Sequence, residues 1–189
     1  MEHHKQEVRL LHKQKRDAMK RKDVLEKSAR ICDSVLRSVI YRNCSILYAC
    51  FPLGNEVDCR QVIRQALCDG KTVALPKTLP DCRMEFYQIQ NLCDVTEGRF
   101  HVMEPVINGP PLQYRDALVL VPGIVFDEEG GRYGFGKGYY DRYFARYPKL
   151  CRAGMAYAHQ MEHSLFLSDH DQRMHVIFTE SCVYDIKSV

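Results

Sequence analysis

The chain has 189 residues, and its 27 Lys and Arg residues against 24 Asp and Glu residues give a formal net charge of +3. This length suits one domain with a sizeable core, and 46% hydrophobic and 27% charged residues are close to globular averages, which excludes a disordered or fibrous chain. No apolar run approaches the roughly 18–20 residues of a membrane helix. The charged N-terminal stretch has no secretory signal, so we expect a cytoplasmic protein.

The nine cysteines are scattered along the chain and include no Cys-x-x-Cys pair. A disulfide framework or a structural zinc site would need paired spacings. We therefore expect small thiols that are buried or half-buried.

The first half of the chain predicts two helices followed by a β-α-β unit. Residues 5–22 are dense in basic charge and predict an exposed helix, on which Lys5, Arg9 and Arg16 fall within a sector of roughly 40°. This cationic stripe fits either a solvated face or an anion site. The apolar spacing of residues 24–40 predicts a core-facing helix. Next come a buried strand at 45–51, a helix at 57–68 and a second strand at 72–75, so that loop 51–56 follows the carboxyl end of the first strand.

The second half of the chain adds further strands and one helix. We expect a short, antiparallel strand at 84–87, irregular structure at 91–111 and the strongest strand at 117–122. A helix at 139–147 and late strands at 151–157 and 176–179 complete the pattern. Strands alternating with helices predict an α/β fold: a single three-layer domain over residues 1–189, with a mostly parallel sheet and helices on both faces.

The segment 121–142 carries the clearest chemical signal, because five glycines cluster within residues 130–138, directly before a predicted helix: Gly130, Gly131, Gly134, Gly136 and Gly138. Glycine lets main-chain N–H groups approach an anion closely, and the start of the following helix favours negative charge. Arg132 and Lys137 add positive charges that could stabilise a transferring phosphoryl group. The pattern fits neither a P-loop nor a dinucleotide fingerprint. A purely structural glycine turn remains the alternative.

The segment from Pro122 to Arg142 closely resembles the signature of the 5-formyltetrahydrofolate cyclo-ligase family, also called methenyltetrahydrofolate synthetase. Its core reads Arg-x-Gly-x-Gly-Lys-Gly-Tyr-Tyr-Asp-Arg. Other elements match in the family's order, among them Lys5-x-x-Val8-Arg9, Pro52…Glu56-Val57-Asp58, Gly70-Lys71…Pro76, Glu104-Pro105 and His170-Asp171. The resemblance covers nearly the whole chain. It departs from the family at His101, where glycine is usual, and at His175, where aspartate is frequent.

The resemblance implies an ATP- and Mg²⁺-dependent cyclisation of 5-formyltetrahydrofolate to 5,10-methenyltetrahydrofolate, with release of ADP and phosphate. The implied route phosphorylates the formyl oxygen, after which N10 attacks the activated carbon and phosphate departs. Such a route needs no enzyme nucleophile. The protein must instead hold two substrates in line and neutralise charge.

The resemblance also implies the site residues. We expect ATP to contact Lys5, Arg9, Arg132, Tyr133, Gly134, Phe135, Gly136, Lys137, Gly138, Tyr139 and Tyr140, with Arg132 and Lys137 as the catalytic residues. Folate is expected at Phe51, Glu56, Phe135, Gly136, Lys137, Gly138 and Tyr139. The Glu56 carboxylate could accept paired hydrogen bonds from a pterin. The implied Mg²⁺ ligands are Asp141 and Asp171.

Two other classes of protein stay open from the residues alone. A glycine loop on an α/β sheet also suits a sugar-phosphate isomerase or another phosphate-binding enzyme. The basic first helix and 11 tyrosines suggest a nucleic-acid-binding protein, but the nearly balanced charge argues against it. We therefore expect a monomer that binds ATP and 5-formyltetrahydrofolate, without nucleic-acid or membrane partners.

Overall fold

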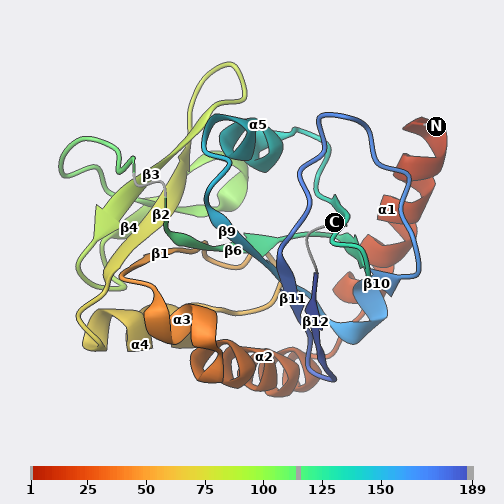
Figure 1. Ribbon diagram of the computed structural model, residues 1–189, viewed down its shortest axis with the longest axis horizontal. Helices are drawn as coiled ribbons and strands as arrows, with labels where there is room; N and C mark the ends of the chain where they lie inside the picture. Colours follow the sequence, from red (N-terminus) through yellow and green to blue (C-terminus); the bar gives the residue numbers. More distant parts are fainter. Residues whose placement is uncertain (1, 114–115, 187–189) are drawn as a thin grey trace.

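A computed structural model describes residues 2–113 and 116–186 (Figure 1). The helices are α1 (Glu2–Asp17), α2 (Arg21–Arg37), α3 (Val39–Asn43), α4 (Arg60–Cys68) and α5 (Tyr139–Arg146), with 3-10 turns η1 (Arg99–His101) and η2 (Ala158–Gln160). The strands are β1 (Ile46–Tyr48), β2 (Thr72–Thr78), β3 (Met84–Ile89), β4 (Val95–Glu97), β5 (Met103–Pro105), β6 (Leu118–Pro122), β7 (Val125–Asp127), β8 (Arg132–Tyr133), β9 (Cys151–Met155), β10 (Met161–Glu162), β11 (Val176–Phe178) and β12 (Val183–Asp185).

The main sheet of the described residues has the strand order β12-β11-β9-β6-β1-β2-β3. Its inner strands β11, β9, β6, β1 and β2 run parallel, and antiparallel strands close it at both edges. Two smaller sheets, β10-β7-β8 and β4-β5, flank it. The predicted mostly parallel sheet is confirmed, as is the antiparallel strand β3.

The side chains of β6 explain why helices cover both faces of this sheet. Successive side chains of a strand point to opposite faces. Leu118 and Leu120 pack in the core against α2 and α4, whereas Val119 and Val121 pack with Phe144 of α5 on the other face. Figure 1 shows α2, α3 and α4 below the sheet and α5 above it. The predicted helices on both faces are confirmed.

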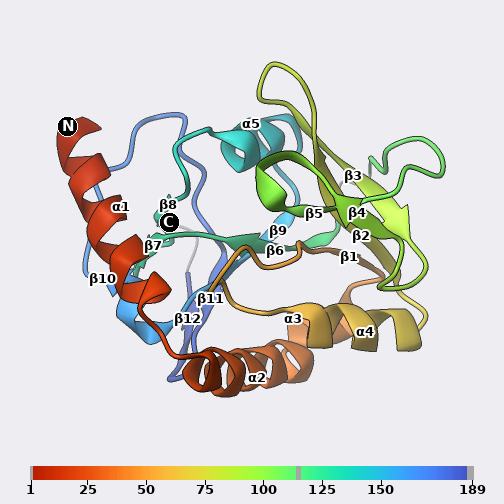
Figure 2. The same cartoon turned by 180° about the vertical axis from the view of Figure 1, so that it is seen from behind.

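Helix α1 was expected to be exposed, but the structure buries one of its faces. Lys5, His12 and Arg16 expose only 5%, 1% and 2% of their surface. Their spacing places them on one face of α1. This face packs beside β7 and η2 (Figure 2). Acidic partners distant in sequence, such as Glu162 at 2.8 Å from His12, make the burial possible. The basic stripe is therefore the inner face of α1.

The segment 91–111, which was expected to be irregular, contains the hairpin β4-β5 around η1. Each of its strands has three residues, too few to show a periodicity. The hairpin is fixed by tertiary contacts, because the buried Glu104 carboxylate of β5 accepts a hydrogen bond from the Thr78 N–H of β2 at 3.0 Å. Strands β7 and β8, inside the glycine-rich segment, were likewise not predicted.

Several boundaries also shift from those expected. The helix predicted at 24–40 is divided at Ser38, whose hydroxyl accepts a hydrogen bond from the Tyr41 N–H and begins α3. Strand β1 is shorter than predicted and ends at Tyr48.

All nine cysteines are unpaired, as expected, although Cys68, Cys93 and Cys182 are exposed rather than buried. In the part of the chain that the structure describes, no helix is long and apolar enough to cross a membrane.

Candidate active site

A cleft of about 560 Å³ opens at the carboxyl ends of β1, β2 and β6. The topology creates it: β1 leads through α4 to β2 on one side, whereas β6 leads through α5 to β9 on the other. The loops after β1 and β6 therefore diverge, and such a switch point is where open α/β sheets bind ligands.

The cleft brings together nearly all the residues implied by the resemblance. Its lining includes Lys5, Arg9, Phe51, Glu56, Arg132, Gly134, Phe135, Gly136, Lys137, Gly138, Tyr139, Tyr140, Asp141 and Asp171. These residues come from α1, from the loop after β1, from the glycine loop (residues 134–138) and α5, and from the segment before β11. The sequence places them far apart, so only the fold assembles them.

The glycine loop needs glycine for conformation and for space. Gly136 and Gly138 have φ angles of +81° and +63°, in the left-handed region where a side chain is strained. A Cβ at Gly134 would lie 2.7 Å from Nη1 of Arg132. The loop therefore wraps closely around a guanidinium, and Gly138 begins α5.

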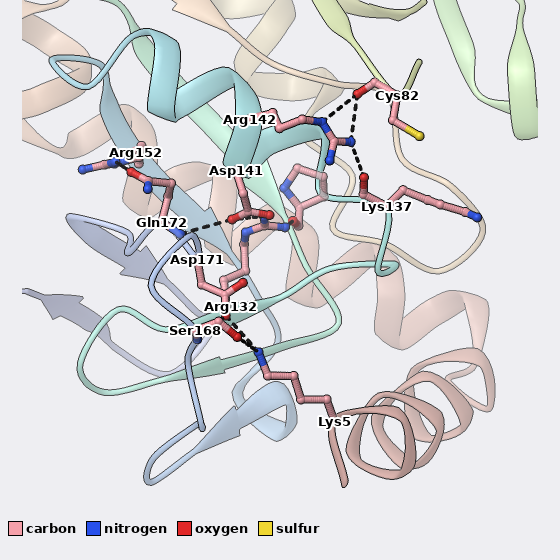
Figure 3. A network of polar contacts seen from close by, with 11 residues as sticks. Lys5, Cys82, Arg132, Lys137, Asp141, Arg142, Arg152, Ser168, Asp171 and Gln172 are labelled. Carbon is pink, nitrogen blue, oxygen red and sulfur yellow. Dashed lines mark hydrogen bonds and ion pairs between the residues drawn. The ribbon is translucent and has the colours of Figure 1, made fainter. Parts of the chain in front are cut away.

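Arg132 is held between the loop and α5. It is 6% exposed, and its Nη2 donates to Oδ2 and Oδ1 of Asp141 at 3.1 and 3.3 Å. Nη1 donates to the Pro122 carbonyl at 3.3 Å, and the Gln172 N–H donates to Asp141 Oδ1 at 3.2 Å (Figure 3). Both members of this ion pair are thus fixed before any ligand binds.

Lys5 and Asp171 form a second ion pair at the same side of the cleft. Lys5 Nζ donates to Asp171 Oδ2 at 2.9 Å and to Ser168 Oγ at 3.0 Å, and the Ser168 N–H donates to the same Asp171 oxygen at 2.7 Å. Burial raises the pKa of Asp171, but the Ser168 N–H and Lys5 outweigh it, so the pKa lies below its ordinary value. Asp171 therefore stays ionised at neutral pH.

Tyr133 is the one implied contact that is absent from the cleft lining among the described residues. It is 2% exposed, and its ring lies beneath the cationic groups of Lys5 and Arg9, each 5.3 Å from the ring centroid. Its hydroxyl donates to the Phe166 carbonyl at 2.9 Å. The Tyr133 ring thus stabilises the two positive charges through cation–π interactions.

Glu56 lies in the loop after β1 and is buried. Its Oε2 accepts the Leu53 N–H at 3.0 Å, and its Oε1 lies 3.5 Å from Nη1 of Arg16. Burial raises the pKa of Glu56, and the positive charge of Arg16 limits the rise. Arg16, the third residue of the basic stripe, therefore pairs with Glu56.

Lys137 differs from the other cations of the site. It is exposed, and in Figure 3 its side chain points away from Arg132 and Asp141. Its main-chain oxygen instead accepts a hydrogen bond from Arg142.

Sequence reasoning missed several residues of the cleft lining, among them Cys50, Leu53, Pro76, Thr78, Met84, Val102, Glu104, Pro122, Ser168 and His170. Proline directly after an apolar run, as at Pro76 and Pro122, was an available signal. Glu104 and His170 stood in matched segments without an assigned role. No local pattern marks Met84 or Val102, which reach the cleft through tertiary packing.

The departures at His101 and His175 fall outside the described lining of the cleft. His101 has a φ of +59°, a conformation that glycine adopts more readily. The Nδ1 atom of His175 accepts the Arg152 N–H at 3.0 Å, and burial together with Arg152 lowers the His175 pKa.

The model of the 5-formyltetrahydrofolate cyclo-ligase family matches residues 1–180. The chain belongs to this family. Its members are ATP-dependent ligases that convert 5-formyltetrahydrofolate to 5,10-methenyltetrahydrofolate. Membership confirms the predicted family and activity. It decides against the two alternatives, a sugar-phosphate isomerase and a nucleic-acid-binding protein.

Individual relatives agree with this assignment. The chain is 35% identical over 128 residues to a probable 5-formyltetrahydrofolate cyclo-ligase of Schizosaccharomyces pombe, covering 64% of this chain and 61% of that protein. It is 27% identical over 183 residues to the Saccharomyces cerevisiae cyclo-ligase, covering 82% and 85%. The solved 5,10-methenyltetrahydrofolate synthetase of Aquifex aeolicus superposes with a TM-score of 0.83 at 28% identity, covering 98% of this chain and 94% of that one. The cyclo-ligase fold is therefore shared along nearly the whole chain.

Proposed function

We propose that the cleft binds ATP and 5-formyltetrahydrofolate side by side, with the glycine loop between them, and catalyses the ring closure. The observation that carries this proposal is the assembly in one cleft of three parts: a cationic corner, the glycine loop and the buried Glu56 carboxylate. Lys5, Arg9 and Arg132 form the cationic corner, where a triphosphate would fit.

The reaction balances without a protein nucleophile. The formyl oxygen attacks the γ-phosphorus of ATP, an O–P bond forms, and ADP leaves. The N10 lone pair then attacks the formyl carbon and closes the ring. N10 loses its proton, and phosphate departs with the electrons of the C–O bond. The protein's part is alignment and charge stabilisation.

Each part of the cleft has a role in this scheme. The main-chain N–H groups of the glycine loop and the start of α5 face the phosphates. Arg132, held by Asp141, stabilises charge on the transferring group, and the exposed Lys137 turns toward that group when both substrates are bound. Glu56 accepts hydrogen bonds from the pterin, against the aromatic surfaces of Phe51 and Tyr139.

Magnesium fits the corner near Asp171 as a partner of ATP. In the described ranges no three acidic, His or Cys side chains gather into a metal site, but Mg²⁺ needs only one or two carboxylates beside phosphates and water. The hydrogen bonds to Asp171 fall on Oδ2, whereas those to Asp141 use both oxygens. Asp171 would be the main carboxylate ligand of the ion, and Asp141 would be the second. The ion would neutralise charge on the phosphates.

The direct test is an absorbance assay of 5,10-methenyltetrahydrofolate formation from 5-formyltetrahydrofolate. We expect product only when ATP and Mg²⁺ are both present, with one ADP released per product. Product formation at the same rate without ATP, or none under any condition, would contradict the proposed function.

Glu56→Gln should raise the KM for 5-formyltetrahydrofolate about 10- to 100-fold and leave the KM for ATP unchanged. A hydrogen bond to a charged group contributes about 1.5–3 kcal/mol, and about 1.4 kcal/mol corresponds to tenfold. Steady-state kinetics with each substrate varied in turn measures both constants. Asp58→Asn is the matched control, because it neutralises a carboxylate of the same loop that pairs with Arg60 outside the cleft. Equal rises in both KM values for Glu56→Gln would contradict this placement.

Asp171→Asn should raise the Mg²⁺ concentration needed for half-maximal rate at fixed ATP. The substitution keeps the shape of the side chain and removes the charge that attracts the ion. Asp169→Asn, at an exposed position two residues away, is the control and should leave the titration unchanged. A wild-type Mg²⁺ titration for Asp171→Asn, with normal activity, would show that this carboxylate serves only Lys5.

A further inference from the structure

A second cavity, of about 390 Å³, opens beside the glycine loop. Its lining consists of Asp81 and Cys82 from the turn between β2 and β3, Arg99 from η1, and Lys137 and Tyr139. We refer to it as the side groove. Lys137 and Tyr139 also line the main cleft, so the two cavities share a wall.

The walls of the side groove are held in place by contacts within the fold. The Arg142 guanidinium donates to the Cys82 carbonyl at 2.9 Å and also to the Lys137 carbonyl, which ties the β2-β3 turn to the glycine loop (Figure 3). On the other side, the contact between Glu104 and Thr78 holds the hairpin that carries η1 against β2. The groove is therefore a defined feature of the fold.

The charges of the side groove are not satisfied within the protein. Arg99 and Lys137 are exposed, and within residues 2–113 and 116–186 no carboxylate forms an ion pair with either. The buried cations Lys5 and Arg132 of the main cleft, by contrast, already have carboxylate partners. Asp81 is the acidic residue among the described lining. An anionic ligand would therefore gain an uncompensated attraction here.

We propose that the side groove binds the glutamyl tail of 5-formyltetrahydrofolate, with the Arg99 guanidinium receiving a tail carboxylate. This inference rests on the proposed function, which places the pterin at Glu56 and the middle of the molecule along the glycine loop. The end opposite the pterin carries two carboxylates, and the side groove begins where Lys137 and Tyr139 end the folate wall of the cleft. A planar guanidinium matches a carboxylate with two parallel hydrogen bonds.

The test compares 5-formyltetrahydrofolate with 5-formyltetrahydropteroate, which lacks the glutamate. Arg99→Ala should raise the KM for 5-formyltetrahydrofolate about twofold to fivefold, as expected for one exposed charge interaction. It should leave kcat, the KM for ATP and the KM for 5-formyltetrahydropteroate at wild-type values. Arg83→Ala is the matched control, because Arg83 is exposed on the same β2-β3 turn but is outside the groove lining. Asp81→Asn should lower the KM for 5-formyltetrahydrofolate.

Equal rises for both folates would overturn the proposal, as would an equal effect of Arg83→Ala, which would indicate a general surface-charge effect. A rise confined to the KM for ATP would assign the groove to phosphate. If the wild-type protein forms no product, the proposed function fails. Equilibrium dialysis with 5-formyltetrahydrofolate and with its analogue still tests the groove in that case: weaker binding of the former alone to Arg99→Ala supports it, and unchanged binding overturns it.

Discussion

Arg132→Ala should lower kcat by about 10²-fold or more and destabilise the fold by about 3 kcal/mol. Loss of one preorganised donor to a transition-state charge costs on the order of 10²–10³-fold. Removal of one member of a buried ion pair leaves the other charge uncompensated, at a cost of about 3–5 kcal/mol. The Asp141 side chain is 16% exposed, so the lower end of that range applies. Turnover and denaturant unfolding measure the two effects.

The double variant Arg132→Ala/Asp141→Asn separates stability from catalysis. It removes the uncompensated charge, so most of the lost stability should return while kcat stays low. Return of both stability and turnover in the double variant would show that Arg132 acts on the fold alone. A double variant as unstable as Arg132→Ala would show that the ion pair is not the source of the destabilisation.

The sheet could be predicted from the sequence because its strands are apolar and its helices have local periodicity. The run around Val119 and Leu120, for example, is apolar on both faces, which is typical of a central parallel strand. The β4-β5 hairpin could not be predicted in the same way. The strand of Val95–Glu97 pairs with Met103–Pro105, and this hairpin is held in place by the contact of Glu104 with the distant Thr78.

Helix α1 shows where a local interpretation fails. A dense run of basic residues normally indicates a solvated helix, but burial depends on partners elsewhere in the chain. Lys5 meets Asp171, and Arg16 meets Glu56, across long sequence separations. The stripe itself was visible in the sequence; the side of the helix that faces the protein was not.

The candidate site likewise contains residues that could be predicted and residues that could not. The glycine loop could be predicted because its glycines, Arg132 and Lys137 lie within a few residues, where their spacing carries meaning. Arg99 and Val102 could not, because the β4-β5 hairpin brings them beside the loop only in the folded chain.

Lys137→Ala should lower kcat by about 10²-fold and leave the melting temperature unchanged. The side chain is exposed, so its loss costs the fold little, whereas a cation on a transferring phosphoryl group contributes several kcal/mol at the transition state. Single-turnover rates together with thermal melts measure both. Lys149→Ala, an equal change at an exposed position after α5, should alter neither.

The orientation of Lys137 makes this test sharper. Its side chain points away from Arg132 in Figure 3 and lines both cavities, so it has two possible anionic partners. A role at the phosphoryl group predicts a lower kcat that Lys137→Arg largely restores, because the positive charge returns. A role at the folate tail alone predicts a higher KM for 5-formyltetrahydrofolate, unchanged kcat and no effect on 5-formyltetrahydropteroate. That second pattern would contradict a catalytic role and would move Lys137 to the side groove beside Arg99.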